Sequence, residues 1–123
     1  MHRSLRYFLA GLCACAPVFA AAQSAVPLAI VRFNQPQVYY EQQLYGALTK
    51  AVSVKPDLLF DVVAYSPLTG KPEVDAAWAQ QTSQHAQAVV ISLQQMGVPV
   101  SRISVTSQSQ PGIRFDETHI YVH

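Results

Sequence analysis

The chain has 123 residues, with eight lysine or arginine side chains against seven aspartate or glutamate side chains and a formal net charge of +1 at pH 7. This length fits one domain rather than two. The basic residues are scattered along the sequence, and because nucleic-acid binding requires concentrated positive charge, the composition argues against a nucleic-acid-binding protein.

The N-terminus has the pattern of a secretory signal peptide. A short basic segment, 1–6, precedes an apolar run, 7–19, that is too short for a typical membrane span. Ala20 and Ala22 then form the A-x-A pattern that signal peptidase reads. We therefore predict a signal peptide that ends at Ala22, export to the periplasm, and a mature domain of residues 23–123.

A second processing route is open at the cysteines. Both cysteines of the chain, Cys13 and Cys15, lie inside the leader, so cleavage after Ala22 leaves a domain that cannot form disulfides. The segment Leu12-Cys13-Ala14-Cys15 also resembles a lipobox, in which Cys15 is the acylated residue. Use of this route would make the protein a lipoprotein with a membrane tether through its lipid anchor.

The first half of the mature chain predicts a strand, a helix and a second strand. The apolar run 28–33 has strand length, and Pro36 suits the first turn of a following helix. An apolar stripe at helical spacing continues that helix: Tyr40, Leu44, Ala47, Leu48 and Ala51. The segment 58–65 is the most apolar run of the mature chain, which predicts a strand in the middle of the sheet, buried on both faces.

The second half predicts another helix and two more strands. The helix runs from about Val74 to Met96 and ends at Gly97 and Pro99. Its predicted buried side consists of Trp78, Ala88, Val89, Leu93 and Met96. Alternation around Ile103 and Val105 predicts a third strand, residues 108–115 a loop, and 118–122 a fourth strand.

This βαβαββ order predicts the fold class. Helices that connect the first three strands imply crossover connections, and therefore an α/β (α+β) two-layer sandwich with the helices packed on one mixed sheet. The loop between the last two strands is compatible with a hairpin at the end of the chain.

The mature chain carries no catalytic signature, such as a glycine-rich phosphate loop, a G-x-S-x-G segment or a cysteine nucleophile. Asp116 and Glu117 are adjacent carboxylates, which we predict to be solvated charges rather than an acid–base pair. His119, Tyr121 and His123 can share one face of a strand, but no third strong metal ligand accompanies them. We predict an exposed polar face of an edge strand there, with no metal, no cofactor and no enzymatic activity.

His85 lies on the second predicted helix, on or beside its buried stripe. It can be a histidine whose hydrogen bonds are satisfied at the helix–sheet boundary, or a polar group that faces a ligand. The sequence supplies it with neither a nucleophile nor an oriented partner, which argues against a hydrolase with His85 as its base.

Several segments resemble the OmpA-like C-terminal domain family. Residues 31–34 (V-R-F-N) resemble its opening strand and turn, residues 60–70 its I-x-G-H-T-D-x-x-G segment, and residues 81–89 its L-S-x-x-R-A-x-A-V segment. Residues 93–103 (L-Q-Q-M-G-V-P-V-S-R-I) are the most specific match, to L-x-x-x-G-(I/V)-x-x-x-R-(I/L). The resemblance covers nearly the whole mature chain and implies an OmpA-like two-layer fold.

Members of this family commonly bind peptidoglycan through the diaminopimelate of the stem peptide. An aspartate holds the ammonium group and an arginine holds the carboxylate. Here the aspartate position falls at Pro67 and the arginine position at His85, a side chain that is mostly neutral near pH 7. The resemblance therefore implies that the usual clamp is absent. It leaves a set of polar residues that should line the same region: Asn34, Tyr65, Ser66, Thr82 and His85.

From these features we expect a non-enzymatic bacterial cell-envelope protein with weak or altered peptidoglycan association. We expect it in the periplasm, with outer-membrane association as an open alternative. The alternative function is a protein-interaction module, or an accessory lipoprotein of an envelope or secretion assembly, that no longer binds peptidoglycan. The partner is then an envelope protein.

Overall fold

Strands and helices alternate along the chain in the predicted order. The computed structural model describes residues 26–123, so the predicted signal peptide, the Ala22 cleavage site and the Cys15 lipidation site lie outside the described residues. The elements are β1 (Ala29–Arg32), α2 (Glu41–Val54), β2 (Phe60–Pro67), α3 (Pro72–Gln95), the 3-10 helix η1 (Val100–Arg102), β3 (Ile103–Gln110) and β4 (Glu117–Val122).

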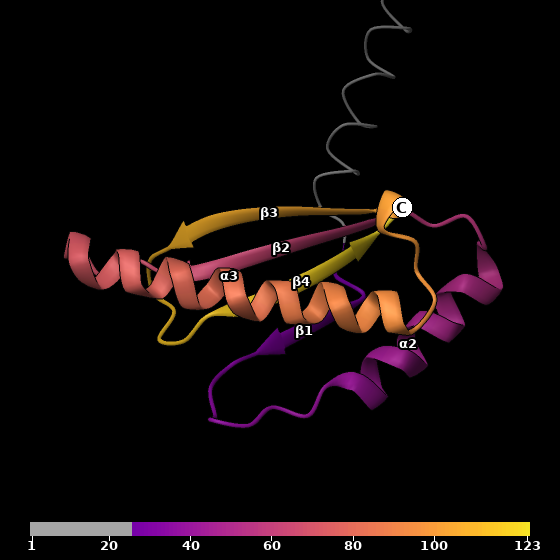
Figure 1. Ribbon diagram of the computed structural model, residues 1–123, viewed down its shortest axis with the longest axis horizontal. Helices are drawn as coiled ribbons and strands as arrows, with labels where there is room; N and C mark the ends of the chain where they lie inside the picture. Colours follow the sequence, from indigo (N-terminus) through magenta and orange to yellow (C-terminus); the bar gives the residue numbers. More distant parts are fainter. Residues whose placement is uncertain (1–25) are drawn as a thin grey trace, which may run out of the picture.

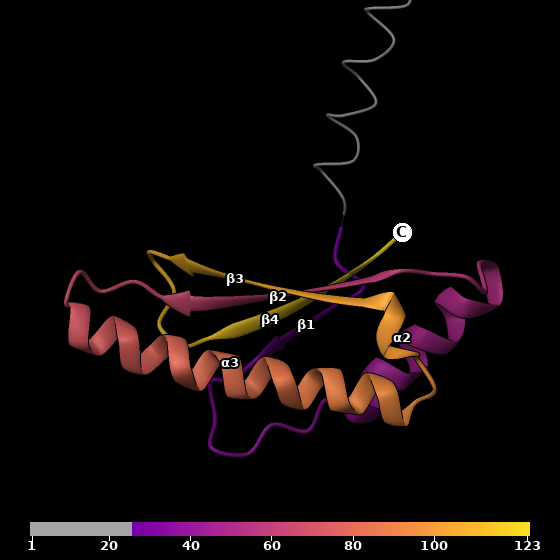
Figure 2. The same ribbon diagram turned by 45° about the horizontal axis from the view of Figure 1, so that its top comes forward.

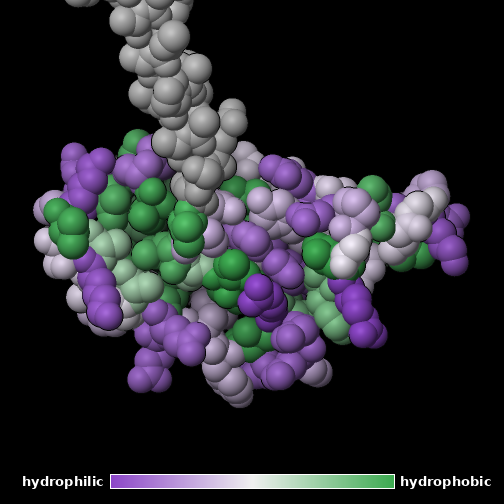
Figure 3. All heavy atoms as spheres, turned by 180° about the vertical axis from the view of Figure 1, so that it is seen from behind, coloured by the Kyte–Doolittle hydropathy of each residue, from purple (hydrophilic) through white to green (hydrophobic). Residues whose placement is uncertain are grey.

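The four strands form one mixed sheet in the order β1-β4-β2-β3 (Figure 1). β4 runs antiparallel to β1 and to β2, whereas β2 and β3 are parallel. Both helices lie on one face of the sheet (Figure 2), which confirms the predicted two-layer arrangement. Figure 3 views the molecule from behind, on the side away from α3, where hydrophilic and hydrophobic side chains are interspersed.

β2 lies in the middle of the sheet, as its apolar sequence predicts. Phe60, Val62 and Ala64 point toward the helices and are buried, because alternate side chains of a strand face the same side. On the other face, Val63 is only half-buried, since no helix of the described residues covers that face. The prediction of burial on both faces is therefore confirmed for the helix side alone.

The core joins both helices to the sheet. Leu44 and Leu48 of α2 are buried, which confirms the predicted stripe of that helix. Val89 and Leu93 of α3 have no exposed surface and pack in the same cluster as Ile120 of β4. Ala88 is exposed, contrary to the prediction, because the side of α3 that faces the sheet passes through Ala86 instead.

The chain does not end in a hairpin. β4 inserts between β1 and β2, two strands away from the edge that β3 occupies. The side chains suit this order, because Thr118 and Ile120 of β4 are completely buried, and an inner strand lies beneath the helices rather than at a margin of the sheet. β3 instead carries mostly serine, threonine and glutamine, which suit an edge in contact with water.

Two element boundaries differ from the prediction. α2 begins at Glu41 rather than near Pro36, and the carboxylate of Glu41 accepts a hydrogen bond from the backbone N–H of Tyr40 (3.2 Å). β3 continues to Gln110, where a loop was expected, because its last residues pair with the end of β2, as in Pro67 with Gln110. A partner strand thus overrides the weak strand propensity of this glutamine-rich segment.

Asp75 stabilises the turn that leads into α3. Its carboxylate accepts hydrogen bonds from the Thr69 hydroxyl (2.7 Å), the Thr69 backbone N–H (2.7 Å) and the Gly70 backbone N–H (3.2 Å). The hydrogen bond from the Thr69 side chain, followed by that from its backbone, holds the pKa of Asp75 below its usual value. A carboxylate with a lowered pKa in the folded state stabilises the fold above its unfolded pKa and loses this effect as the pH falls.

We expect Asp75→Asn to be less stable than the wild type at neutral pH. The difference should shrink as the pH falls below about 4, the ordinary aspartate value, toward the lower folded pKa. Urea unfolding of both proteins at neutral and acid pH measures it. Asp57→Asn, at an exposed aspartate in the loop before β2, is the control. A stability difference that grows on acidification would contradict this assignment.

Candidate functional site

The carboxyl ends of β1, β2 and β3 lie together at one end of the strands, where β4 begins (Figure 1). Phe33 follows β1, Ser66 lies near the end of β2, and Asp116 precedes β4. α3 passes over these strand ends and contributes Thr82 and His85. We call these five residues the strand-end site.

A histidine–carboxylate pair lies at the centre of the strand-end site. His85 Nδ1 is 2.7 Å from Asp116 Oδ2, and the side chain of Asp116 is completely buried while that of His85 is 33% exposed. The Gln81 amide donates a longer hydrogen bond, of 3.5 Å, to the other Asp116 oxygen. The ring of Phe33 stacks on the imidazole, with centroids 4.0 Å apart and planes within 11°. Asp116 and Phe33 together fix the orientation of His85.

This geometry corrects two sequence-based predictions. Asp116 is not a solvated charge but a buried one, and His85 does have an oriented partner. The alternation along β4 indicates the position of Asp116. Asp116 lies two and four residues before the buried Thr118 and Ile120, so its side chain points to the same face of the sheet. His85 therefore lies at the helix–sheet boundary with one nitrogen engaged.

Hydroxyl groups form a second part of the strand-end site. Thr82 donates to the backbone oxygen of Trp78 (2.6 Å), and Ser66 donates to the backbone oxygen of Gln108 (3.4 Å). Ser66 and Thr82 line one hollow of about 160 Å³ between α3 and β3. Thr118 of β4, opposite Ala64 of β2, is completely buried, and its hydroxyl has no hydrogen-bond partner within residues 26–123.

The five residues predicted to line one region lie in different places. Thr82 and Ser66 share the hollow, and His85 lies one helical turn along α3 from Thr82. Asn34 is exposed in the loop after β1. Tyr65 points to the opposite face of the sheet, where its ring lies 4.6 Å from that of His119. The ligand-binding role of all five stays a prediction, but they do not line a single region.

The face of the sheet that carries Tyr65 holds a network of polar contacts. His119 Nε2 is 2.9 Å from Glu117, and its Nδ1 is 3.4 Å from the Tyr121 hydroxyl. Burial, followed by the hydrogen bond with Tyr121, raises the pKa of Tyr65. β4 is an inner strand, so the prediction of an edge strand there is wrong. Within residues 26–123, no group of three or more potential metal ligands of the His, Cys, Asp or Glu type is close enough to bind an ion.

The charges of the strand-end site do not form the clamp that a zwitterion requires. Pro67, at the position where the resemblance implies an aspartate, has no charge and no backbone donor. The carboxylate of Asp116 lies beneath His85 and is already engaged. When Nδ1 of a neutral histidine donates to a carboxylate, its Nε2 becomes a hydrogen-bond acceptor. The arrangement can thus accept one hydrogen bond from a hydroxyl, amide or ammonium group.

Comparison with known proteins adds no assignment. No protein-family model matches this chain, and no curated protein matches it. No helix in residues 26–123 combines the length and the apolar character that crossing a membrane requires. The geometry of the described residues is therefore the basis for a functional proposal.

Proposed function

We propose that this chain is a non-enzymatic bacterial cell-envelope protein with an OmpA-like fold and a weak, altered association with peptidoglycan. The signal-peptide pattern and the segments that resemble the family support the location and the fold type. The observation that carries the proposal is the His85–Asp116 pair, which occupies the position where the resemblance implies an arginine. His85 keeps a polar side chain at this position, while the carboxylate of Asp116 is engaged by His85 and is not free to bind a ligand.

The proposed contact is a hydrogen bond to His85 Nε2. Asp116 holds the imidazole from below and Phe33 covers one face of the ring, so the exposed part of His85 is presented in one orientation. An amide, hydroxyl or ammonium group of the peptide stem can donate to this nitrogen. Without a bidentate guanidinium and a free carboxylate, the contact is weaker and less selective than paired charges would provide. It should also depend little on salt, because no free charge pair forms.

Co-sedimentation of the exported protein with purified sacculi tests the proposal. We expect weak but saturable binding that persists at high salt. His85→Gln keeps an amide donor for Asp116 but removes Nε2, so we expect affinity to fall by about fivefold, the equivalent of one hydrogen bond. His123→Gln is the matched control, since His123 is an exposed histidine that pairs with Asp61 away from the strand-end site. Equal binding by all three proteins would exclude His85 from the contact, and absence of binding would contradict the function itself.

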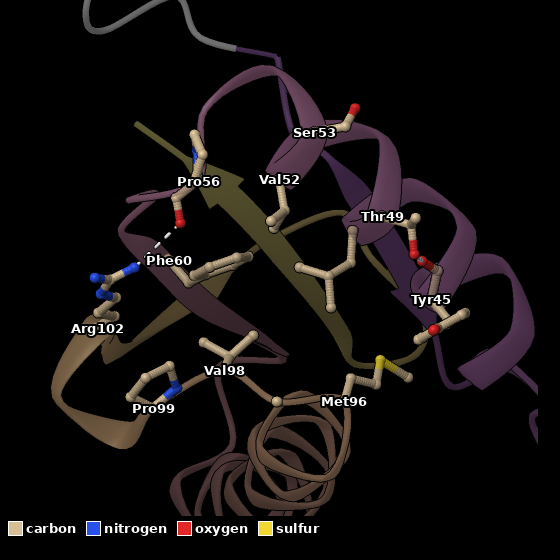
Figure 4. Close-up of a pocket in the computed structure, with 12 residues that line it drawn as sticks. Tyr45, Thr49, Val52, Ser53, Pro56, Phe60, Met96, Val98, Pro99 and Arg102 are labelled. Atoms are coloured by element: carbon tan, nitrogen blue, oxygen red, sulfur yellow. Dashed lines mark hydrogen bonds between the residues drawn. The ribbon is translucent and has the colours of Figure 1, made fainter.

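A groove at the other end of the sheet favours the alternative function, a protein-interaction module. Figure 4 shows Val52, Phe60, Met96 and Val98 converging from α2, β2 and the segment that follows α3. The groove has a volume of about 390 Å³ and is lined mainly by apolar side chains. Arg102 at its rim donates a hydrogen bond to the backbone oxygen of Pro56 (3.2 Å). If the protein fails to sediment with sacculi, photo-crosslinking from this groove in intact cells tests the alternative.

A further inference from the structure

The outer edge of β3 is long and unpaired. β3 is the last strand of the sheet, and seven of its eight residues are exposed. It pairs with β2 along its full length on one side, while on its other side no strand of residues 26–123 lies beside it. Unpaired N–H and C=O groups on a regular edge form a template for another strand.

The features that usually protect such an edge are missing from β3. Its sequence, I-S-V-T-S-Q-S-Q, contains no charged residue, no proline and no glycine. The pairing of Ile103–Gln110 with Phe60–Pro67 is continuous, so no bulge twists the edge away. β1, the opposite edge, is half as long and ends at Arg32, whose guanidinium lies 3.7 Å from Glu117. Edge protection by charge and shortness is thus present at β1 and absent at β3.

The helix beside β3 also carries little charge, although on the other face of the sheet Asp61 of β2 accepts a hydrogen bond from the Ser104 hydroxyl of β3 (2.6 Å). Ala79 of α3 lines the same hollow as Ser107 and Ser109, so this helix lies next to the edge strand. From Ala76 to Gln95, α3 contains no aspartate, glutamate, lysine or arginine. Val105 is 47% exposed on β3 itself. Depletion of charge is a property of the cores of protein interfaces.

We propose that two copies of this chain pair through β3, antiparallel and about a two-fold axis, so that their sheets join into one. An axis perpendicular to the sheet keeps the helices of both copies on the same face. Such an axis requires one residue of β3 to lie opposite the same residue of the second copy. If the strands pair along their full length, this residue is Thr106 or Ser107, in the middle of β3. Because like residues meet near such an axis, a charged edge would repel itself, whereas this neutral edge is compatible with self-pairing.

The oligomeric state of the exported protein tests this proposal. Sedimentation equilibrium should show a dimer, and Thr106→Lys should make it monomeric, because it brings two lysines close together beside the axis. Gln43→Lys, on the exposed side of α2, should stay dimeric and controls for the added charge. Circular dichroism of both variants verifies that each is folded. A wild type that is monomeric at its highest soluble concentration overturns the proposal, as does a Thr106→Lys variant that dimerises like the control.

Single cysteines test the register. Residues 26–123 contain no cysteine, so each introduced thiol is the sole one in this part of the chain. Thr106→Cys or Ser107→Cys should form a disulfide-linked dimer under mild oxidation. Gln110→Cys should not, because its copy lies roughly 20–26 Å away at about 3.3 Å per residue. Equal cross-linking at Gln110, or none at either central position, overturns the pairing geometry.

Discussion

His85→Ala is expected to lower the free energy of unfolding by about 3 kcal/mol, because it leaves a buried charge without its partner. The Asp116 side chain has no exposed surface, and its other contact, with Gln81, is at the outer limit of a hydrogen bond (3.5 Å). Loss of the imidazole also uncovers the ring of Phe33, which stacks on it. Urea unfolding of the purified variant measures the change.

A second substitution separates the charge effect from lost packing. Adding Asp116→Asn to His85→Ala removes the unpaired charge, so the double variant should recover part of the stability that the single variant loses. His123→Ala is the control, since its ion pair with Asp61 is exposed and contributes at most about 1 kcal/mol. If the His85 and His123 variants unfolded at the same urea concentration, the His85–Asp116 pair would not be a buried interaction.

Leu93→Ala is expected to cost about 2–5 kcal/mol, the range for removing a large side chain from a closed core. Leu93 has no exposed surface and belongs to the cluster that joins α3 to the sheet. Ile91, two residues earlier on the same helix, is 45% exposed, so Ile91→Ala should cost less than about 1 kcal/mol. Thermal or urea unfolding of the two variants compares them. Similar losses would mean that α3 packs with a different face toward the sheet.

The sequence predicts the layers of this fold because its periodicity is strong. The apolar run that contains Val62 specifies a central strand, and the spacing of Leu44 and Leu48 specifies which side of α2 is buried. The same periodicity does not predict the order of the strands, because that order depends on which strands of the sheet each new strand pairs with. The position of β4 between β1 and β2 follows from the burial of Ile120, which a linear pattern does not distinguish from burial in a hairpin.

The candidate site was only partly predictable for the same reason. His85 was singled out from its place on the stripe of α3, but its partner Asp116 comes from a different element, 31 residues later. A pair of adjacent carboxylates suggests solvated charges when it is considered alone. Strand parity separates the two, because Asp116 faces the core whereas Glu117 faces the other side of the sheet. Tyr65 and Ser66 also point to opposite faces of the sheet, because they are neighbours on one strand. Their adjacency in a motif does not show this.

Nitrogen-detected NMR of the histidine side chains tests the central claim most directly. A protein of residues 23–123 is titrated with soluble muropeptides that contain diaminopimelate. We predict that the proton of the His85–Asp116 hydrogen bond lies on Nδ1, and that the Nε2 shift of His85 changes to saturation while the shifts of His119 and His123 stay constant. Saturable changes confined to His119, or no change at any histidine while the muropeptide binds, would contradict a role of the strand-end site in peptidoglycan association.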